Sequence, residues 1–78
     1  MNEKRRQEIR KAIKLMEDAD EILAQTAADE RDAFDAKPEN LRPYEEEVDL
    51  ETLEREQSDL SFGIRALRAI EGIEPLSK

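Results

Sequence analysis

The sequence contains no cysteine and no histidine, and these two absences exclude several classes of protein. The chain can form no disulfide, and it has no thiolate or imidazole ligand for zinc or another transition metal. The usual acid–base pairs and thiol nucleophiles of enzymes are missing as well. The serines have no histidine partner, and there is no glycine-rich phosphate loop. We therefore predict a protein that is not an enzyme and that has no metal and no cofactor.

Aromatic residues and long apolar runs are also scarce. The chain of 78 residues is 44% charged and 4% aromatic, and it has no stretch near the ~18 consecutive apolar residues of a membrane helix. Its basic N-terminus precedes no apolar core of a signal peptide. We expect one cytoplasmic domain with no membrane partner. A domain this small buries a thin core, so well-packed helices or self-association must stabilise it.

One long helix is the strongest feature of the sequence. No proline or glycine occurs before Pro38, and apolar or small residues recur at steps of three and four, which is typical of an amphipathic helix. We predict a helix over residues 3–36. Its apolar stripe consists of Ile9, Ile13, Met16, Leu23, Ala27 and Phe34, with the polar residues Asp20 and Glu30 completing the series.

Two prolines five residues apart end this helix and predict a connection over residues 37–48, with one helical turn at 38–41. We expect Leu41 and Tyr44 to fold onto Phe34; the alternative is a Tyr44 that faces solvent. A second helix is predicted over residues 49–71 with Asp49 as its N-cap. Gly72 is expected to be a left-handed cap, and residues 72–78 to form a tail. The stripe of this second helix is Leu50, Leu53, Gln57, Leu60, Ile64 and Leu67.

Both predicted helices have more apolar surface than one partner helix can cover. A second stripe on the first helix lies one position, or about 100°, from the first stripe. On the second helix, Phe62 and two alanines lie away from the main stripe; the alternative is ordinary surface exposure. We predict an all-α antiparallel two-helix hairpin that self-associates, most simply into a four-helix bundle. The second stripe is Ala12, Leu15, Ala19, Ile22 and Ala33, and the expected oligomer interface is Ile9, Ile13, Leu15, Met16, Ile22, Leu23, Phe62, Ala66 and Ala69.

Charge is distributed unevenly along the chain. Residues 1–14 have six basic and two acidic residues (+4), residues 17–59 have four basic and seventeen acidic residues (−13), and residues 60–78 sum to +1, which together give the net −8. An antiparallel hairpin then has one basic end and one acidic end. We expect a reversed dimer, which places the basic end of one hairpin along the acidic end of the other.

Two charged surfaces are candidate binding sites. The first is a basic cluster that can hold a small anion such as a nucleotide through guanidinium contacts; the alternative is that these residues pair with carboxylates. The second is the acidic surface, which either imitates nucleic acid for a basic partner or serves only solubility. Direct DNA binding is not expected at this net charge. The basic cluster is Arg5, Arg6, Arg10, Lys14, Arg65 and Arg68.

Three stretches resemble a family of short uncharacterised phage and prophage proteins. They are the basic opening Asn-Glu-Lys-Arg-Arg-Gln-Glu-Ile, the segment Ala-Asp-Glu-Arg-Asp-Ala-Phe-Asp at 28–35, and Pro-Glu-Asn-Leu at 38–41. The chain departs from the family pattern at Arg-Pro-Tyr after Leu41 and at Phe62 and Gly63. The resemblance implies a phage origin, the cytoplasm of the host, and a helical hairpin. It transfers no active site.

The sequence and this resemblance together lead to one expected function and two alternatives. We expect a non-catalytic protein that acts by protein–protein interaction, on itself and on a host protein or defence system. The first alternative is an oligomer that binds a small anionic ligand such as a nucleotide at its basic end. The second is a structural assembly component.

Overall fold

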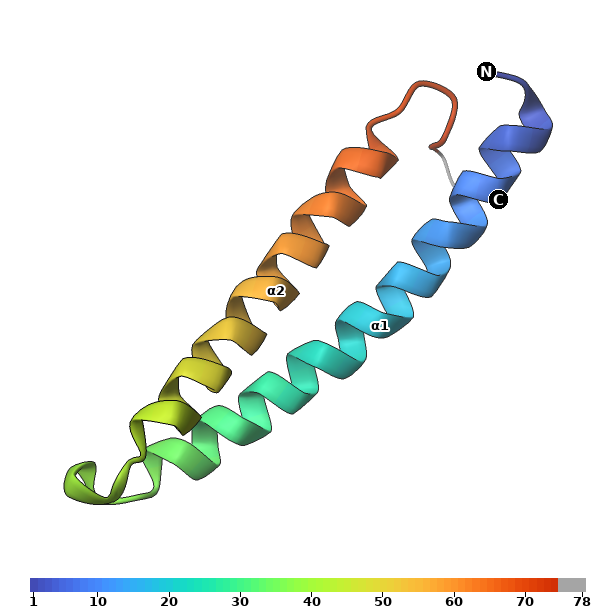
Figure 1. The fold of residues 1–78 in the computed structure, drawn as a ribbon. Helices are drawn as coiled ribbons and strands as arrows, with labels where there is room; N and C mark the ends of the chain where they lie inside the picture. Colours follow the sequence, from blue (N-terminus) through green and yellow to red (C-terminus); the bar gives the residue numbers. More distant parts are fainter. Residues whose placement is uncertain (75–78) are drawn as a thin grey trace.

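The computed structural model describes residues 1–74 and shows two long helices packed antiparallel in a hairpin (Figure 1). Helix α1 is Glu3–Asp35, the short 3-10 helix η1 is Glu39–Leu41, and helix α2 is Tyr44–Arg68. The hairpin is an elongated rod with extents of 56 × 19 × 14 Å. The predicted all-helical fold with two helices packed on each other is confirmed. Neither α1 nor α2 has a stretch apolar enough to cross a membrane.

Helix α1 has the boundaries that the sequence predicts, to within one residue. The Asn2 side chain accepts a hydrogen bond from the Arg5 backbone amide at 2.9 Å, which caps the first turn. At the other end the chain leaves the helix at Ala36, two residues before Pro38, because a proline disfavours helical geometry at the residue that precedes it. The predicted turn at 38–41 is present as η1.

Helix α2 begins five residues earlier than predicted and ends three residues earlier. Pro43 occupies the N-cap position with extended backbone, so the helix starts immediately after it and Asp49 lies inside the helix. Three glutamates, residues 45–47, lie in the first turn, where carboxylates are stabilised by the helix dipole. The predicted boundaries 37–48 and 49–71 were wrong because this favourable first turn was assigned to the connection.

The residues after α2 form a tight turn that returns to α1. Gly72 has a φ of +88°, which confirms the expected left-handed conformation, but it is not the helix cap, because α2 ends at Arg68 and Ala69 is its C-cap. The turn brings Ile73, which has no exposed surface, against Ile13 and Ile64. Ile73 is therefore a core residue and not part of a tail. The rest of the predicted tail, residues 75–78, lies outside the described residues.

The core is divided between the two ends of the rod. At the end with the termini, Ile13, Ile64 and Ile73 are buried, and Ile9, Met16, Leu60, Leu67 and Ile70 pack around them. Near the connection, the buried residues are Ala27, Phe34 and Leu50. The prediction that Leu41 and Tyr44 cover Phe34 was wrong, since their side chains are 62% and 77% exposed. The guanidinium groups of Arg31 and Arg42 lie over the Phe34 ring instead, at 5.9 and 5.5 Å from its centroid.

Candidate interaction surface

In addition to the two apolar regions of the core, polar contacts join α1 to α2. Gln57 Nε2 donates a hydrogen bond to Asp20 Oδ1 at 2.8 Å, so two polar residues of the predicted stripes satisfy each other. Arg68 forms an ion pair with Glu17. Arg31 donates two hydrogen bonds to the Glu54 carboxylate, at 3.0 and 2.8 Å. These contacts fix the register of the hairpin itself.

Hydrogen bonds from arginine side chains lower the pKa values of two carboxylates, Glu54 and Glu3. Hydrogen bonds from Arg31 hold the pKa of Glu54 below its ordinary value, and Glu54 in turn raises the pKa of Arg31. A hydrogen bond from Arg10 lowers the pKa of Glu3 in the same way. A lowered pKa makes each carboxylate a weaker base, so neither is tuned to act as a general base at neutral pH.

The side of α1 that α2 does not cover has two large apolar side chains in solvent. Leu15 and Ile22 are 65% and 66% exposed. They are seven residues apart, or about 700° around the helix, so they lie almost directly one above the other. Ala12 and Ala19, also exposed, lie on the same side. We call these four residues the outer face of α1.

The outer face is separate from the polar contacts that α1 makes with α2. Leu15 lies two positions, or about 200°, from Glu17, whose side chain reaches α2. Along its edge run Met16 and Leu23, which are half-buried against the hairpin core. Met16 lies over Gly63 of α2, where a Cβ atom would be 3.7 Å from the Met16 Cε atom. The outer face therefore continues into the apolar contact between the helices.

The structure separates the predicted interface residues into two groups. Ile13 is fully buried in the hairpin core and has no surface to offer a second subunit, and Ile9, Met16 and Leu23 are half-buried there. Sequence periodicity placed them on the core stripe but could not show that α2 alone would cover them. The predicted interface residues that remain exposed are Leu15, Ile22, Phe62, Ala66 and Ala69.

Phe62 lies on the opposite side of α2 from its packed stripe, about 200° from Leu60. Its side chain is 62% exposed. The guanidinium of Arg65 lies 5.5 Å from the ring centroid, and such a cation–π contact stabilises an exposed pair by about 0.5–1 kcal/mol. This aromatic ring therefore already has a partner within its own helix.

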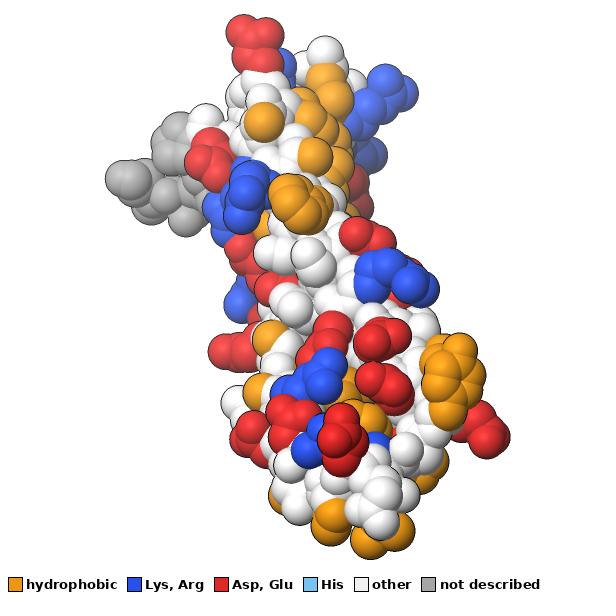
Figure 2. All heavy atoms as spheres, turned by 90° about the vertical axis from the view of Figure 1, so that its left-hand side faces the viewer, with side chains coloured by type: hydrophobic (Ala, Val, Ile, Leu, Met, Phe, Trp, Pro, Cys, Tyr) orange, Lys and Arg blue, Asp and Glu red, His pale blue; other side chains and the backbone are white. Residues whose placement is uncertain are grey.

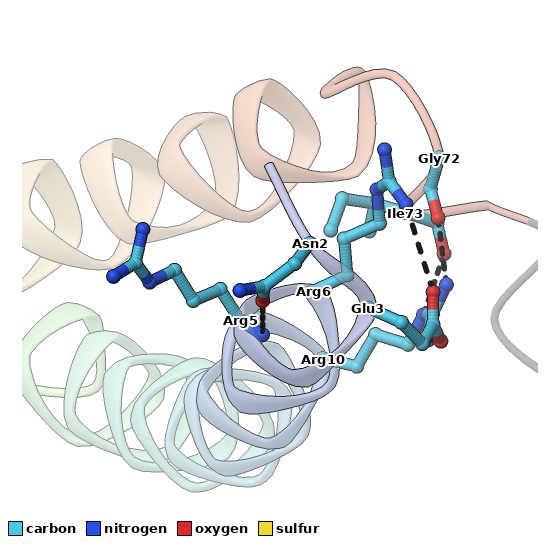
Figure 3. Close-up of polar contacts among 7 residues, drawn as sticks. All are labelled: Asn2, Glu3, Arg5, Arg6, Arg10, Gly72 and Ile73. Carbon is cyan, nitrogen blue, oxygen red and sulfur yellow. Dashed lines mark hydrogen bonds and ion pairs between the residues drawn. The ribbon is translucent and has the colours of Figure 1, made fainter.

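Two residues of the predicted basic cluster, Arg6 and Arg10, lie against the C-terminal turn (Figure 3). Arg10 donates hydrogen bonds to the carbonyl oxygens of Gly72 at 2.6 Å and Ile73 at 3.0 Å, and to Glu3 at 2.7 Å. Arg6 lies against Gly72, where a Cβ atom would come within 2.5 Å of the Arg6 Nε atom. We call these contacts the Arg10 clamp. The sequence did not predict this clamp. Gly72 indicated a turn, and the antiparallel arrangement placed the basic N-terminal segment near it.

The other basic residues are divided between paired and unpaired groups. Lys14 pairs with Asp18 at 3.1 Å, and Arg68 pairs with Glu17 and also with Glu74 at 3.1 Å. Within residues 1–74, only Arg5 and Arg65 of the predicted cluster form no ion pair with a carboxylate. These two side chains come from different helices. The arrangement is not one of several free cations converging on an anion.

The acidic end has a hollow of about 160 Å³. Glu30, Phe34, Glu46, Asp49, Leu50 and Leu53 line it. Figure 2 shows acidic side chains gathered in the half of the molecule nearer the connection, and hydrophobic side chains at both ends of this view. Among the described residues no three carboxylates are placed to hold a metal ion. The hollow is therefore a shallow acidic depression with an apolar floor.

Comparison of the chain with protein-family models, curated proteins and solved structures found no match. The function must therefore be argued from the surface of the hairpin. Its most distinctive feature is the outer face of α1, because large apolar side chains lie there in solvent beside a well-satisfied polar side.

Proposed function

We propose that this chain is a small non-catalytic binding protein that acts by protein–protein contact and first associates with itself. Two hairpins pack through the outer face of α1 and form a four-helix bundle. The observation that supports this proposal is the exposure of Leu15 and Ile22, at 65% and 66% of their surface, one above the other on one helix. An aligned pair of this kind on a rigid helix is typical of an interface.

Burial of these exposed side chains would contribute to the stability of a dimer. Fully burying a leucine or isoleucine side chain stabilises by about 1.5–3 kcal/mol relative to leaving it exposed. A symmetric pair of hairpins buries four such side chains, two from each copy. Because Ala12 and Ala19 lie beside them and add little bulk, the backbones of the two α1 helices can come close. Because a single hairpin has only a thin core, association would add substantially to its stability.

The apolar surface around Phe62 supports the proposal less strongly. The Phe62 ring is already covered in part by Arg65, and it faces away from α1. We therefore assign the bundle contact to α1 and expect Phe62, Ala66 and Ala69 to stay at the periphery of the dimer.

The binding of a small anion is not favoured by the structure, because Arg10, Lys14 and Arg68 are engaged within the hairpin. A phage origin and action on a host protein rest only on the resemblance of the basic opening and of residues 28–41. They are part of the proposal only in this sense: a hairpin that self-associates through α1 leaves the acidic first turn of α2 free for a further, basic protein.

The dependence of thermal unfolding on protein concentration tests self-association. A dimer unfolds at a higher temperature as its concentration rises, whereas a monomer does not. We expect a rise for the wild type and its loss in the double variant Leu15→Ser, Ile22→Ser. The matched control is Leu41→Ser, which replaces a side chain of similar exposure, 62%, at the connection. A wild-type unfolding temperature that does not change with concentration would overturn the proposal.

A further inference from the structure

We infer that the second copy binds in reverse, with α1 of one hairpin on α1 of the other and a two-fold axis beside Ala19. This inference rests on the proposed self-association and adds the orientation and register of the pair. Leu15 of each copy then lies between Ile22 and Leu23 of the other. The two basic ends point in opposite directions, each along the acidic half of the other α1.

The spacing of residues on the outer face fits this register. Ala12, Leu15, Ala19, Ile22 and Thr26 follow one another at steps of three, four, three and four. Ala12 and Thr26 each lie seven positions from Ala19, so in a reversed pair Ala12 meets Thr26 and Ala19 meets its own counterpart, whereas Leu15 and Ile22 lie four and three positions from Ala19 and interdigitate. Small residues at 12, 19, 26 and 33 recur every seventh position, and they allow antiparallel helices to approach at the short end of the usual 8–10 Å.

Charge selects the reversed orientation over the alternative. Residues 3–16 have six basic and two acidic residues (+4), and residues 21–34 have one basic and four acidic residues (−3). The reversed register places these two segments of α1 side by side in both halves of the dimer. If the hairpins pointed the same way, their acidic ends, from the segment 17–59 with its net −13, would lie together. Unlike charges at an interface favour the first arrangement and like charges disfavour the second.

Arg5 and Glu30 are a specific pair for this contact. Both side chains are exposed, and neither forms an ion pair with another residue of the segment 1–74. In the reversed register they lie within about one helical turn of each other across the interface. In one chain they are 25 positions apart on α1, or about 37 Å, so the same chain cannot bring them together.

Engineered cysteines test the register directly. Since the sequence has no cysteine, a single Ala19→Cys substitution places one thiol per chain beside the axis. Mild oxidation should then give a covalent dimer for most of the protein. The matched control is Ala33→Cys, exposed on the same helix, whose two thiols would be about 42 Å apart in the reversed register. A covalent dimer of the Ala33→Cys variant, with none of the Ala19→Cys variant, would contradict the reversed pairing.

A charge exchange between chains gives an independent test. Arg5→Glu alone and Glu30→Arg alone each place like charges together twice in a homodimer, so each should weaken dimerisation about tenfold. A mixture of the two variants should form a heterodimer in which one of the two contacts joins the exchanged pair and the other keeps the original pair, so both are again of opposite sign. Its affinity should be near that of the wild type. Weakening without recovery on mixing would overturn the Arg5–Glu30 contact.

The outcomes separate this inference from the proposal on which it rests. A dimeric wild type, combined with no crosslink in the Ala19→Cys variant and no recovery on mixing, overturns the register but leaves self-association standing. A wild type that is monomeric at all concentrations overturns both. Crosslinking of the Ala19→Cys variant together with recovery on mixing establishes the reversed pair.

Discussion

The two ends of the hairpin use their charged residues in different ways. At the end with the termini, two of the basic side chains serve the fold: Arg10 holds the C-terminal turn, and Arg68 pairs with Glu17 and Glu74. At the connection end, Phe34 is covered by two guanidinium groups, and carboxylates line an open hollow. One end uses most of its basic cluster in contacts within the hairpin, and the other keeps an excess of negative charge at its surface.

This difference explains why a basic N-terminus does not make an anion site. A cation that holds a carbonyl oxygen or a carboxylate of its own chain is unavailable to a ligand unless that contact is broken. At the connection end, the hairpin has too few basic side chains to pair with all of the carboxylates. In the proposed reversed dimer, a second copy would supply cations such as Arg5 and Lys4 from the other end.

The largest expected effect comes from breaking the core at the end with the termini. Ile13→Ala leaves a cavity where the side chain is fully buried, and we expect a loss of about 3 kcal/mol in the free energy of unfolding, within the ~2–5 kcal/mol of such changes. Urea denaturation measures it. Leu41→Ala, at an exposed position, serves as the control and should change stability by less than about 0.5 kcal/mol. Equal losses for both variants would mean that Ile13 is not in the core.

A smaller effect should follow from removing the Arg10 clamp. Arg10→Met keeps much of the apolar stem and removes hydrogen bonds to two carbonyl oxygens, which together stabilise by about 1–2 kcal/mol. Hydrogen exchange of the Ile73 amide, which donates to the Ile70 carbonyl oxygen at 3.1 Å, should become faster while that of Leu50 near the connection does not. Acceleration at both sites alike would indicate global destabilisation and contradict a local clamp.

The two glycines should respond to alanine in opposite directions. Gly63→Ala adds a Cβ atom at ordinary contact distance from Met16, 3.7 Å, inside a helix, and should stabilise by about 0.5–1 kcal/mol. Gly72→Ala meets Arg6 at 2.5 Å and has a φ of +88°, so it should destabilise by about 1 kcal/mol or more. Thermal unfolding of both variants checks the signs. A stabilising Gly72→Ala would contradict the close packing of the clamp.

The smallest effect concerns pH and the other half of the hairpin. Because Arg31 lowers the pKa of Glu54 in the folded state, this carboxylate contributes stability above its ordinary pKa of about 4.5, and the contribution is lost as the pH falls through the lowered value. Glu54→Gln should therefore unfold at a lower temperature than the wild type at neutral pH, and this difference should shrink in acid. A difference that is the same at neutral and acid pH would exclude the ion pair as its cause.

Much of the hairpin could be predicted from the sequence, and the errors have physical causes. Two features were enough to predict α1 and its packing against a second, antiparallel helix. They are the spacing of Ile9, Ile13 and Met16 and the absence of proline before residue 38. The start of α2 was misplaced because a proline can precede a helix as well as end one. Leu41 and Tyr44 were expected inside because they are apolar, but two arginines cover Phe34 in their place.

The interaction surface was only partly predictable. Periodicity identified Leu15 and Ile22 as a second stripe. The structure shows that α2 leaves both side chains exposed, which makes this stripe the candidate interface. The same reasoning wrongly assigned Ile13 to the oligomer interface, because a sequence pattern does not tell how much of a stripe one partner helix covers. The Arg10 clamp depends on a turn that returns to α1, and no local pattern specifies where such a turn will dock.

The mass of the wild-type protein in solution tests the central claim most directly. Sedimentation equilibrium over a wide range of concentrations gives this mass independently of molecular shape, which matters for a rod of this kind. Self-association through the outer face of α1 predicts twice the chain mass of 9.0 kDa at high concentration, with dissociation on dilution or in the Leu15→Ser, Ile22→Ser variant. A mass of 9.0 kDa at every concentration would contradict the account.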